Sequence, residues 1–90
     1  MPSDQSLCAT DLKADVALDV TGLRCPMPLL KTRQQLRAMS PGALLVVRAD
    51  DPGAQRDIPA WLRQTDHQLV HSCGHGGLHE FFIRVEDKRE

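Results

Sequence analysis

The sequence predicts a two-layer α/β (α+β) sandwich in which two helices cover a four-stranded mixed sheet. A length of 90 residues suits one small domain. Hydrophobic residues make up 41% of the chain and charged residues 26%, which is typical of a globular domain. The apolar patterns follow the order β-α-β-α-β-β, and this alternation favours two packed layers. We expect a flexible tail over residues 1–14, a single domain over residues 15–86 and a frayed end over residues 87–90.

The first half of this domain predicts a strand, a helix and a second strand. Apolar and polar side chains alternate over residues 16–20, as in a half-buried strand. Apolar residues recur at helical spacing over residues 26–39. Pro26 and Pro28 both fit the first turn of this helix, where backbone N–H groups have no partner within the helix. The continuous apolar run over residues 43–47 indicates a buried strand.

The second half predicts a helix followed by a hairpin. Over residues 54–65 the apolar side chains share one helical face. This helix either begins with Asp57 as its cap or is kinked at Pro59. Residues 67–72 and 80–85 have the patterns of two strands, and the glycine-rich stretch between them predicts a loop or a wide turn.

Charge and composition argue against several classes of function. Eleven Lys and Arg against twelve Asp and Glu leave a formal net charge of −1, which does not favour nucleic-acid binding. With only 3% aromatic residues, the chain offers no platform for stacked bases. No apolar run is long enough for a membrane span, and the polar N-terminus lacks the features of a signal peptide. We therefore expect a cytoplasmic protein that does not bind a membrane.

One of the three cysteines, Cys25, has a distinctive setting. An odd number of cysteines argues against a closed disulfide framework. Cys25 lies in the segment Gly22–Pro28, where the first strand gives way to the first helix. Unpaired N–H groups and the helix dipole favour a thiolate there, so we expect the pKa of Cys25 to be lowered. Pro26 and Pro28 would fix the turn and direct the sulfur outward, and position 28 offers no second thiol for dithiol chemistry.

Positive charge surrounds Cys25 along the chain. No acidic residue occurs between Asp19 and Asp50. The basic residues in this interval are Arg24, Lys31, Arg33, Arg37 and Arg48. Such a segment favours a thiolate or a persulfide anion, and it would attract an acidic partner surface.

Four short motifs accompany this cysteine. They are Leu18-Asp19, Gly22-Leu23-Arg24-Cys25-Pro26-Met27-Pro28, Ala49-Asp50-Asp51-Pro52 and Arg56-Asp57-Ile58-Pro59. With them the chain resembles the TusA/SirA-like family of small sulfur-carrier proteins, from about Val16 to Val85. The C-P-x-P box after Gly-Leu-Arg is the most specific of these motifs. The resemblance implies the same β-α-β-α-β-β sandwich that the periodicities predict.

The resemblance also implies a sulfurtransferase-type carrier in which Cys25 accepts a sulfane sulfur as a persulfide. The donor would be a cysteine desulfurase of the IscS type and the acceptor a TusBCD-like or other protein, with tRNA 2-thiouridine as the favoured destination. Family members that serve molybdenum-cofactor synthesis or sulfur oxidation leave the pathway open, and whether the chain counts as an enzyme stays open too. This chemistry implies no metal, no organic cofactor and no direct contact with nucleic acid. A single exposed nucleophile favours a monomer.

Sulfur handover requires transient contacts, for which we expect a small interface. Arg24 and backbone N–H groups would stabilise the persulfide anion on Cys25. Arg33 and Arg37, one helical turn apart, are expected to form part of the partner-binding surface. Leu30 would add an apolar contact, and Asp51 is a weaker candidate.

Two other interpretations of Cys25 remain open. In the first, the chain is a non-catalytic regulatory or interaction module, and the C-P-M-P box serves only as a helix cap. In the second, Cys25 and Cys73 form the disulfide of a redox sensor, which requires their Cα atoms to lie within about 7 Å of each other.

Several other residues are better explained by structure than by function. A cluster near the C-terminus has the chemistry of zinc ligands, but its spacing and its glycines favour a strand end and exposed loop histidines rather than a metal site. Its members are His71, Cys73, His75 and His79. We expect Asp57 to cap a helix and Trp61 to pack against the sheet. We expect Asp50 and Asp51 to form a turn, and Cys8 to be exposed in the tail without a role.

Overall fold

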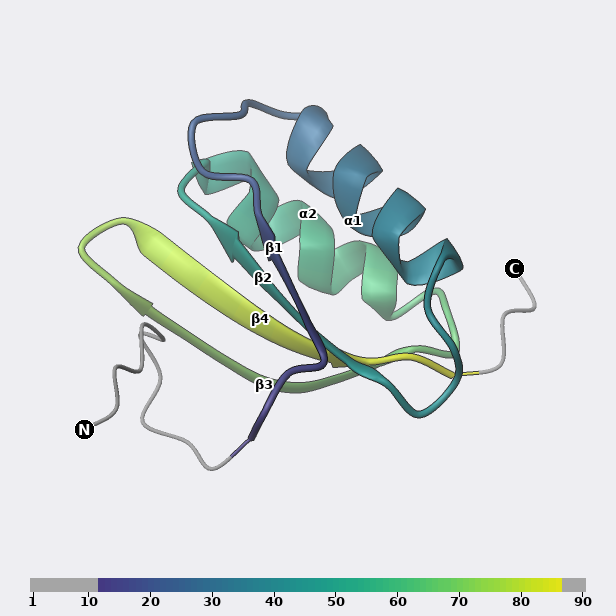
Figure 1. Ribbon diagram of the computed structural model, residues 1–90. Coiled ribbons are helices and arrows are strands. Elements are labelled where there is room, and N and C mark those ends of the chain that lie inside the picture. The colour runs from purple at the N-terminus through teal and green to yellow at the C-terminus, as the bar shows by residue number, and fades with distance from the viewer. Residues whose placement is uncertain (1–11, 87–90) are drawn as a thin grey trace.

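The computed structural model describes residues 12–86, and two helices lie on the same face of one sheet (Figure 1). Residues 1–11, with Cys8, and residues 87–90 lie outside the described part of the chain. The elements in chain order are β1 (Val16–Asp19), α1 (Met27–Arg37), β2 (Leu44–Ala49), α2 (Pro52–Leu62), β3 (Gln68–His75) and β4 (Leu78–Arg84). This arrangement confirms the predicted α+β sandwich.

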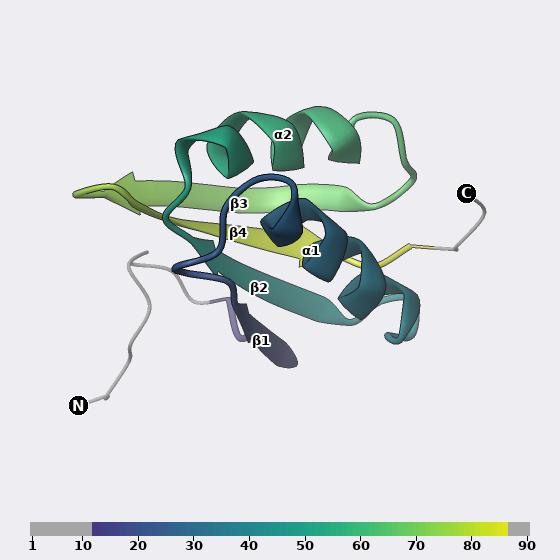
Figure 2. The same cartoon turned by 90° about the horizontal axis from the view of Figure 1, so that it is seen from above.

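The strands follow the order β1-β2-β4-β3 across the sheet (Figure 2). β1 pairs with β2 in parallel, and β4 pairs antiparallel with both β2 and β3. Neighbouring parallel strands need a crossover connection, which α1 supplies between β1 and β2. Because β1 and β2 run in the same direction, the loops that follow Asp19 and Ala49 leave the sheet at the same end.

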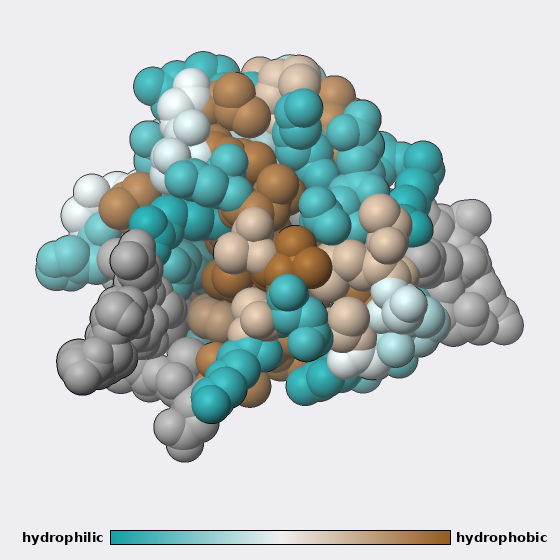
Figure 3. Space-filling view, viewed as in Figure 1, coloured by the Kyte–Doolittle hydropathy of each residue, from teal (hydrophilic) through white to brown (hydrophobic). Residues whose placement is uncertain are grey.

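An aliphatic core lies between the sheet and the helices. α1 turns Thr32 and Leu36 inward, and α2 turns Ala54, Ile58 and Leu62 inward. The sheet residues that meet them are Leu45, Val47, Ala49, Phe81 and Ile83, with Val85 just beyond β4. In Figure 3, apolar residues gather in the middle of the face where β1 runs past α1, and hydrophilic residues surround them. Burial of each large aliphatic side chain stabilises the fold by about 1.5–3 kcal/mol.

Trp61 joins the two helices at the margin of this core. Its side chain is partly buried against the core. The guanidinium carbon of Arg33, on α1, lies 5.6 Å from the centroid of the Trp61 ring, which is a cation–π distance. The ring of His67 also contacts this indole, in a tilted arrangement with 6.2 Å between the ring centroids. The expected packing of Trp61 is therefore confirmed only in part, because cationic and imidazole groups share its surface.

The start of α2 excludes one sequence-based alternative, a helix that begins at Asp57, and agrees with the other in placing Pro59 inside the helix. The helix begins at Pro52, Asp51 is its N-cap residue, and Pro59 lies inside it. The expectation that Asp57 caps a helix is wrong, because Pro52 already provides the first-turn proline that helix starts favour. Neither α1 nor α2, the two helices among residues 12–86, is long and apolar enough to cross a membrane.

The hairpin between β3 and β4 is tighter than the expected loop. β3 continues through His75 and β4 begins at Leu78, so only Gly76 and Gly77 lie between the strands. Their φ values are +60° and +88°. A two-residue hairpin turn with positive φ at both positions is the type I′ geometry, which glycine adopts without steric cost.

Gly74, on β3, should not tolerate a side chain. The ring of His79, its partner on β4, lies so close that an added Cβ would overlap it, and this ring is stacked on Phe81 at 6.3 Å between centroids. We expect Gly74→Ala to lower the free energy of unfolding by about 1–3 kcal/mol, as overpacking does. Denaturant unfolding provides the measurement.

The matched control for this substitution is Ser72→Ala, on the same strand and exposed. A strand glycine without a close neighbour would gain stability from alanine through a lower entropy of the unfolded chain. A neutral or stabilising Gly74→Ala would therefore contradict the assigned His79 packing. In a double-mutant cycle, His79→Ala should remove most of the Gly74→Ala penalty.

Candidate functional site

The turn after β1 is built by local hydrogen bonds. The Asp19 carboxylate accepts one hydrogen bond from the Thr21 backbone N–H at 3.0 Å and another from the Thr21 hydroxyl at 2.7 Å. These bonds favour the ionised carboxylate, so they lower the pKa of Asp19. Gly22 follows with φ +86°, a conformation that glycine adopts readily. The turn directs the chain from the sheet toward α1.

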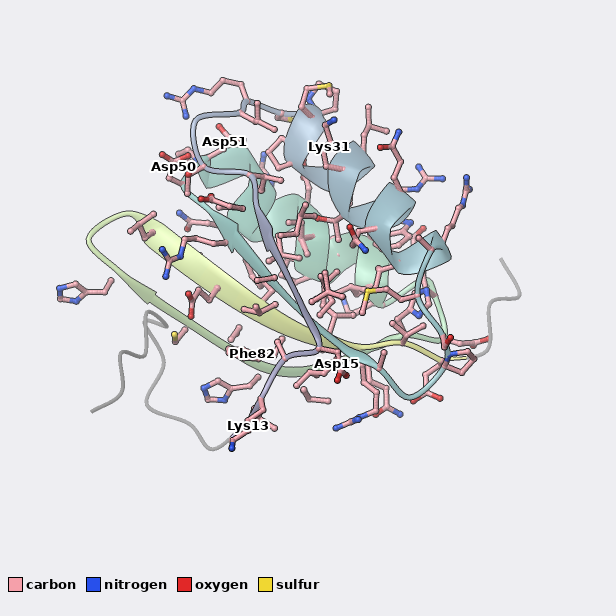
Figure 4. All side chains as sticks on the ribbon, viewed as in Figure 1. Lys13, Asp15, Lys31, Asp50, Asp51 and Phe82 are labelled. Carbon is pink, nitrogen blue, oxygen red and sulfur yellow. The ribbon has the colours of Figure 1, made fainter. Side chains whose placement is uncertain are left out.

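Two carboxylates from the loop after β2 hold this segment in place. Asp50 accepts a hydrogen bond from the Gly22 N–H at 2.9 Å, and Asp51 accepts one from the Cys25 N–H at 3.2 Å. Figure 4 shows Asp50 and Asp51 beside the loop that joins β1 to α1. The bonded residues are 28 and 26 positions apart along the chain, so only the parallel pairing of β1 with β2 brings them together.

Gly53 lets Cys25 approach the first turn of α2. A Cβ added at Gly53 would lie 3.3 Å from the Cys25 Cβ and 3.8 Å from its Sγ. It would also lie 3.0 Å from an oxygen of Asp51, which is tighter than ordinary packing. A residue with a side chain at position 53 would therefore press on both Cys25 and the carboxylate that holds it.

The thiol of Cys25 is exposed and faces a third carboxylate. Cys25 is a free cysteine in this structure. Its Sγ donates a hydrogen bond to Oδ2 of Asp57, on α2, at 3.4 Å. The other oxygen of Asp57 lies 3.7 Å from the Arg56 Nε. The predicted exposure of the sulfur is thus confirmed, but its nearest polar partner is an acid.

The expected lowering of the Cys25 pKa is wrong. The hydrogen bond to Asp57 raises the pKa of this thiol, and the negative charges of Asp57 and Asp51 act in the same direction. In addition, α1 begins at Met27 with Pro26 as its N-cap residue, so Cys25 precedes the helix. A carboxylate at hydrogen-bond distance disfavours a second negative charge beside it, which holds Cys25 as a neutral thiol.

The predicted cationic surroundings of Cys25 are only partly formed in space. Arg24 is near Cys25 in sequence, but its Nη1 lies 3.9 Å from Oδ1 of Asp51, and its side chain is 71% exposed. Arg48 instead pairs with the buried Glu80 at 2.9 Å. Arg33 lies over Trp61. The interval of sequence around Cys25 contains no acidic residue. In the folded protein, however, acidic residues from α2 and from the loop after β2 lie next to the sulfur.

The exposed face of α1 carries the other predicted partner-binding residues. Leu30 is 39% exposed, and Met27, three residues earlier, is 40% exposed. Lys31 and Arg37 are exposed on the same helix, and α1 contains no acidic residue. On the inner side, Pro28 is buried and its carbonyl accepts a hydrogen bond from the Thr32 hydroxyl at 2.8 Å. Met27 belongs to this surface although the helical pattern of the sequence did not point to it.

The histidines and Cys73 near the C-terminus do not converge. His71 contacts Phe82, and Cys73 packs near Leu44 and Phe82, on the sheet face away from the helices. His79 instead stacks on Phe81, which faces the helices. Among residues 12–86 no group of three or more His, Cys, Asp or Glu side chains is arranged to hold a metal ion.

The positions of the two cysteines argue against a disulfide between Cys25 and Cys73. Cys73 belongs to the sheet face opposite the helices, whereas Cys25 lies against α2. Cys25 has a free thiol, so the two residues are not bridged in this structure. Residues 12–86 therefore do not support the Cys25–Cys73 disulfide that the redox-sensor interpretation requires.

Gly53 and the roles of Asp50 and Asp57 escaped the sequence analysis. The motif Asp50-Asp51-Pro52 and the segment around Asp57 were noted, but as a turn and a helix cap. The available signal was topological, because residues that follow two neighbouring parallel strands meet at one end of a sheet. The order β-α-β contains this information, but it does not specify which carboxylate faces the sulfur.

The raised pKa of Cys25 can be tested by titration. We expect Asp57→Asn to lower the pKa of Cys25, because it removes the negative charge closest to the thiol. The thiolate ultraviolet absorbance, taken as the difference between each protein and its Cys25→Ser counterpart, gives the midpoint. Asp66→Asn, between the end of α2 and the start of β3, is the control and should leave the midpoint unchanged. A midpoint that rises or stays constant in Asp57→Asn would contradict the assigned contact.

Comparison with known proteins identifies the family of this chain. A family model described as Sulfurtransferase TusA matches residues 16–85. The Sulfur carrier protein TusA of Allochromatium vinosum is 43% identical over 70 residues, which cover 78% of this chain and 92% of that protein. The Putative sulfur carrier protein YrkI of Bacillus subtilis is 36% identical over 73 residues, which cover 81% of this chain and 97% of that protein.

A solved structure supports the same fold. The SirA-like protein from Desulfitobacterium hafniense superposes with a TM-score of 0.59, covers 80% of this chain and 99% of its own, and is 16% identical. At this identity the likeness concerns the architecture alone. The family match over the whole sandwich and the high coverage of both relatives together establish that this chain belongs to the TusA family of sulfur carriers.

Proposed function

We propose that Cys25 carries a sulfane sulfur, as a persulfide, from a cysteine desulfurase to an acceptor protein. The observation that supports this most directly is the exposed, free thiol of Cys25, held by hydrogen bonds between two loops. A thiol that must meet two protein partners in turn has to be accessible to both. Membership of a sulfur-carrier family supports the same role.

The proposed transfer is a thiol–persulfide exchange. The sulfur of Cys25 attacks the outer sulfur of the donor persulfide, the bond between the two donor sulfurs breaks, and the donor cysteine leaves as a thiolate. An acceptor thiol then repeats the reaction on the Cys25 persulfide. Each step exchanges one S–S bond for another, so the chain needs no metal or organic cofactor for it.

We further propose that the carried sulfur serves tRNA 2-thiouridine synthesis through a TusBCD-like acceptor in the cytoplasm, with the carrier acting as a monomer. A reducing compartment keeps a surface thiol free for loading. The formal charge of −1 supports contacts with proteins rather than with tRNA itself. Molybdenum-cofactor synthesis and sulfur oxidation are the competing destinations, and transfer assays with purified acceptors of each kind would separate them.

Persulfide formation on Cys25 can be observed directly. After incubation of the protein with a cysteine desulfurase, pyridoxal phosphate and cysteine, we expect the intact mass to increase by one sulfur atom and to return to its original value on reduction. Cys25→Ser should show no increase, because it lacks the acceptor thiol. Cys73→Ser is the matched control and should load normally. Sulfur found on Cys73, or normal loading of Cys25→Ser, would overturn the assignment and favour a non-catalytic module.

The exposed face of α1 is the surface that we propose for the partners. Met27 and Leu30 form an apolar pair next to Cys25 in sequence, and Lys31 and Arg37 add positive charge to the same helix. Charged groups at the rim of an interface mainly accelerate association with an oppositely charged surface. The proposed partners therefore present an acidic surface. Arg33 and Asp51 are weaker contributors, because the first lies over Trp61 and the second holds the Cys25 loop.

Charge reversal at Arg37 tests this surface. We expect Arg37→Glu to slow loading by the desulfurase about tenfold at low salt, because it replaces an attraction by a repulsion, and to reduce the dependence of the rate on salt. Loading from a small persulfide, which needs no docking surface, should be unchanged. Arg63→Glu, an exposed charge reversal at the end of α2, is the control. Equal effects of the two substitutions would rule out a specific role for α1.

A further inference from the structure

The hydrogen bond between Cys25 and Asp57 has a chemical consequence for sulfur loading. The sulfur must lose its proton to attack a persulfide, and Oδ2 of Asp57 already accepts that proton in a hydrogen bond at 3.4 Å. The donor cysteine, in turn, leaves as a thiolate that takes up a proton. A single carboxylate beside the sulfur can serve both needs.

We propose that Asp57 is the general base of sulfur loading, an inference that rests on the proposed carrier function. As Cys25 Sγ attacks the outer sulfur of the donor, its proton moves to Oδ2 of Asp57. A new S–S bond forms between Cys25 and the transferred sulfur, and the S–S bond within the donor breaks. Asp57 then passes the proton to the departing donor thiolate, so charge and atoms balance and no oxidant or reductant is consumed.

Asp57 is held in the orientation that this role requires. It lies inside α2 rather than on a loop, and its side chain is 33% exposed. Its Oδ1 faces the Arg56 Nε at 3.7 Å, which leaves Oδ2 directed toward the sulfur. Gly53, one turn earlier on the same helix, permits the close contact with Cys25. The packing of α2 against the core therefore fixes the backbone that carries the acceptor oxygen of Asp57.

The other charged groups near the sulfur do not replace Asp57. Asp51 is directed to the Cys25 backbone N–H and to Arg24, so it acts on the sulfur only through its charge. The positive charge of Arg56 acts in the opposite sense. Because these charges hold Cys25 as a thiol, a mechanism that used only pre-formed thiolate would lose rate in neutral solution. Proton transfer to Asp57 during the attack avoids this loss.

The experiment compares loading rates across the pH range in which the Cys25 thiol titrates. The full-length protein, Asp57→Asn, Asp57→Glu and the control Asp66→Asn are each mixed with glutathione persulfide. The reaction is quenched at intervals, and the gain of one sulfur on Cys25 is followed by mass spectrometry. Because the same donor is used for both proteins, the effect of donor ionisation on the rate cancels in the ratio of wild-type to variant rates at each pH. Thermal melting confirms that each variant is folded.

The proposal predicts that this ratio depends on pH. For Asp57→Asn it should be about 10²-fold at the lowest pH, as expected for loss of a general base, and should approach one above the pKa of the thiol, where both proteins react as thiolates. Asp57→Glu should recover part of the rate. Asp66→Asn should match the wild type throughout.

Two results would overturn the role of Asp57. A ratio that differs from one by the same factor at every pH would indicate a purely structural residue. Faster loading of Asp57→Asn in neutral solution would show that Asp57 only suppresses the thiolate. Failure of the wild-type protein itself to acquire sulfur would instead contradict the proposed carrier function, so the two proposals fail in different ways.

Discussion

The parallel pairing of β1 with β2 is the constraint on which the candidate site depends. It brings the loop before α1 next to the loop before α2, and the carboxylates of Asp50 and Asp51 then bond the backbone of Gly22 and Cys25. Hydrogen bonds to a charged acceptor are stronger than those between neutral groups. A loop that would otherwise have few backbone partners is thereby tied to the start of α2, and the position of the sulfur follows from sheet topology.

The three carboxylates around Cys25 have different tasks. Asp50 and Asp51 accept hydrogen bonds from backbone groups and hold the loop, whereas Asp57 accepts a hydrogen bond from the thiol itself. Asp57 and Asp51 raise the pKa of Cys25, which keeps the resting sulfur neutral although the flanking sequence is basic. A neutral thiol is less reactive toward stray oxidants than a thiolate is. In the proposed mechanism the thiol of Cys25 is therefore protected at rest, and Asp57 accepts its proton when a donor arrives.

α1 links the position of the sulfur to the surface that a partner meets. Its inner face is anchored by Pro28, Thr32 and Leu36, which are buried against the core. Its outer face is free of acidic residues and begins with the exposed pair Met27 and Leu30. Because a helix is rigid over such a short distance, a partner bound to the outer face has a defined distance to Cys25. The same eleven-residue helix thus serves the fold and the proposed docking surface.

Local patterns in the chain were sufficient to predict the order of the elements, the fold class and the exposure of Cys25. Alternation over residues 16–20 and helical spacing over residues 26–39 report which side chains share a face, and the Gly-Leu-Arg-Cys-Pro box marks the junction between them. The electrostatic state of the sulfur could not be predicted in this way. Along the chain its near neighbours are basic, but in the folded protein Asp57, 32 residues away, is the group that bonds the thiol. Periodicity records neighbours within a strand or a turn of helix, whereas a pKa is set by every charge within a few ångströms, and only the packing of α2 against the Cys25 loop decides which charges those are.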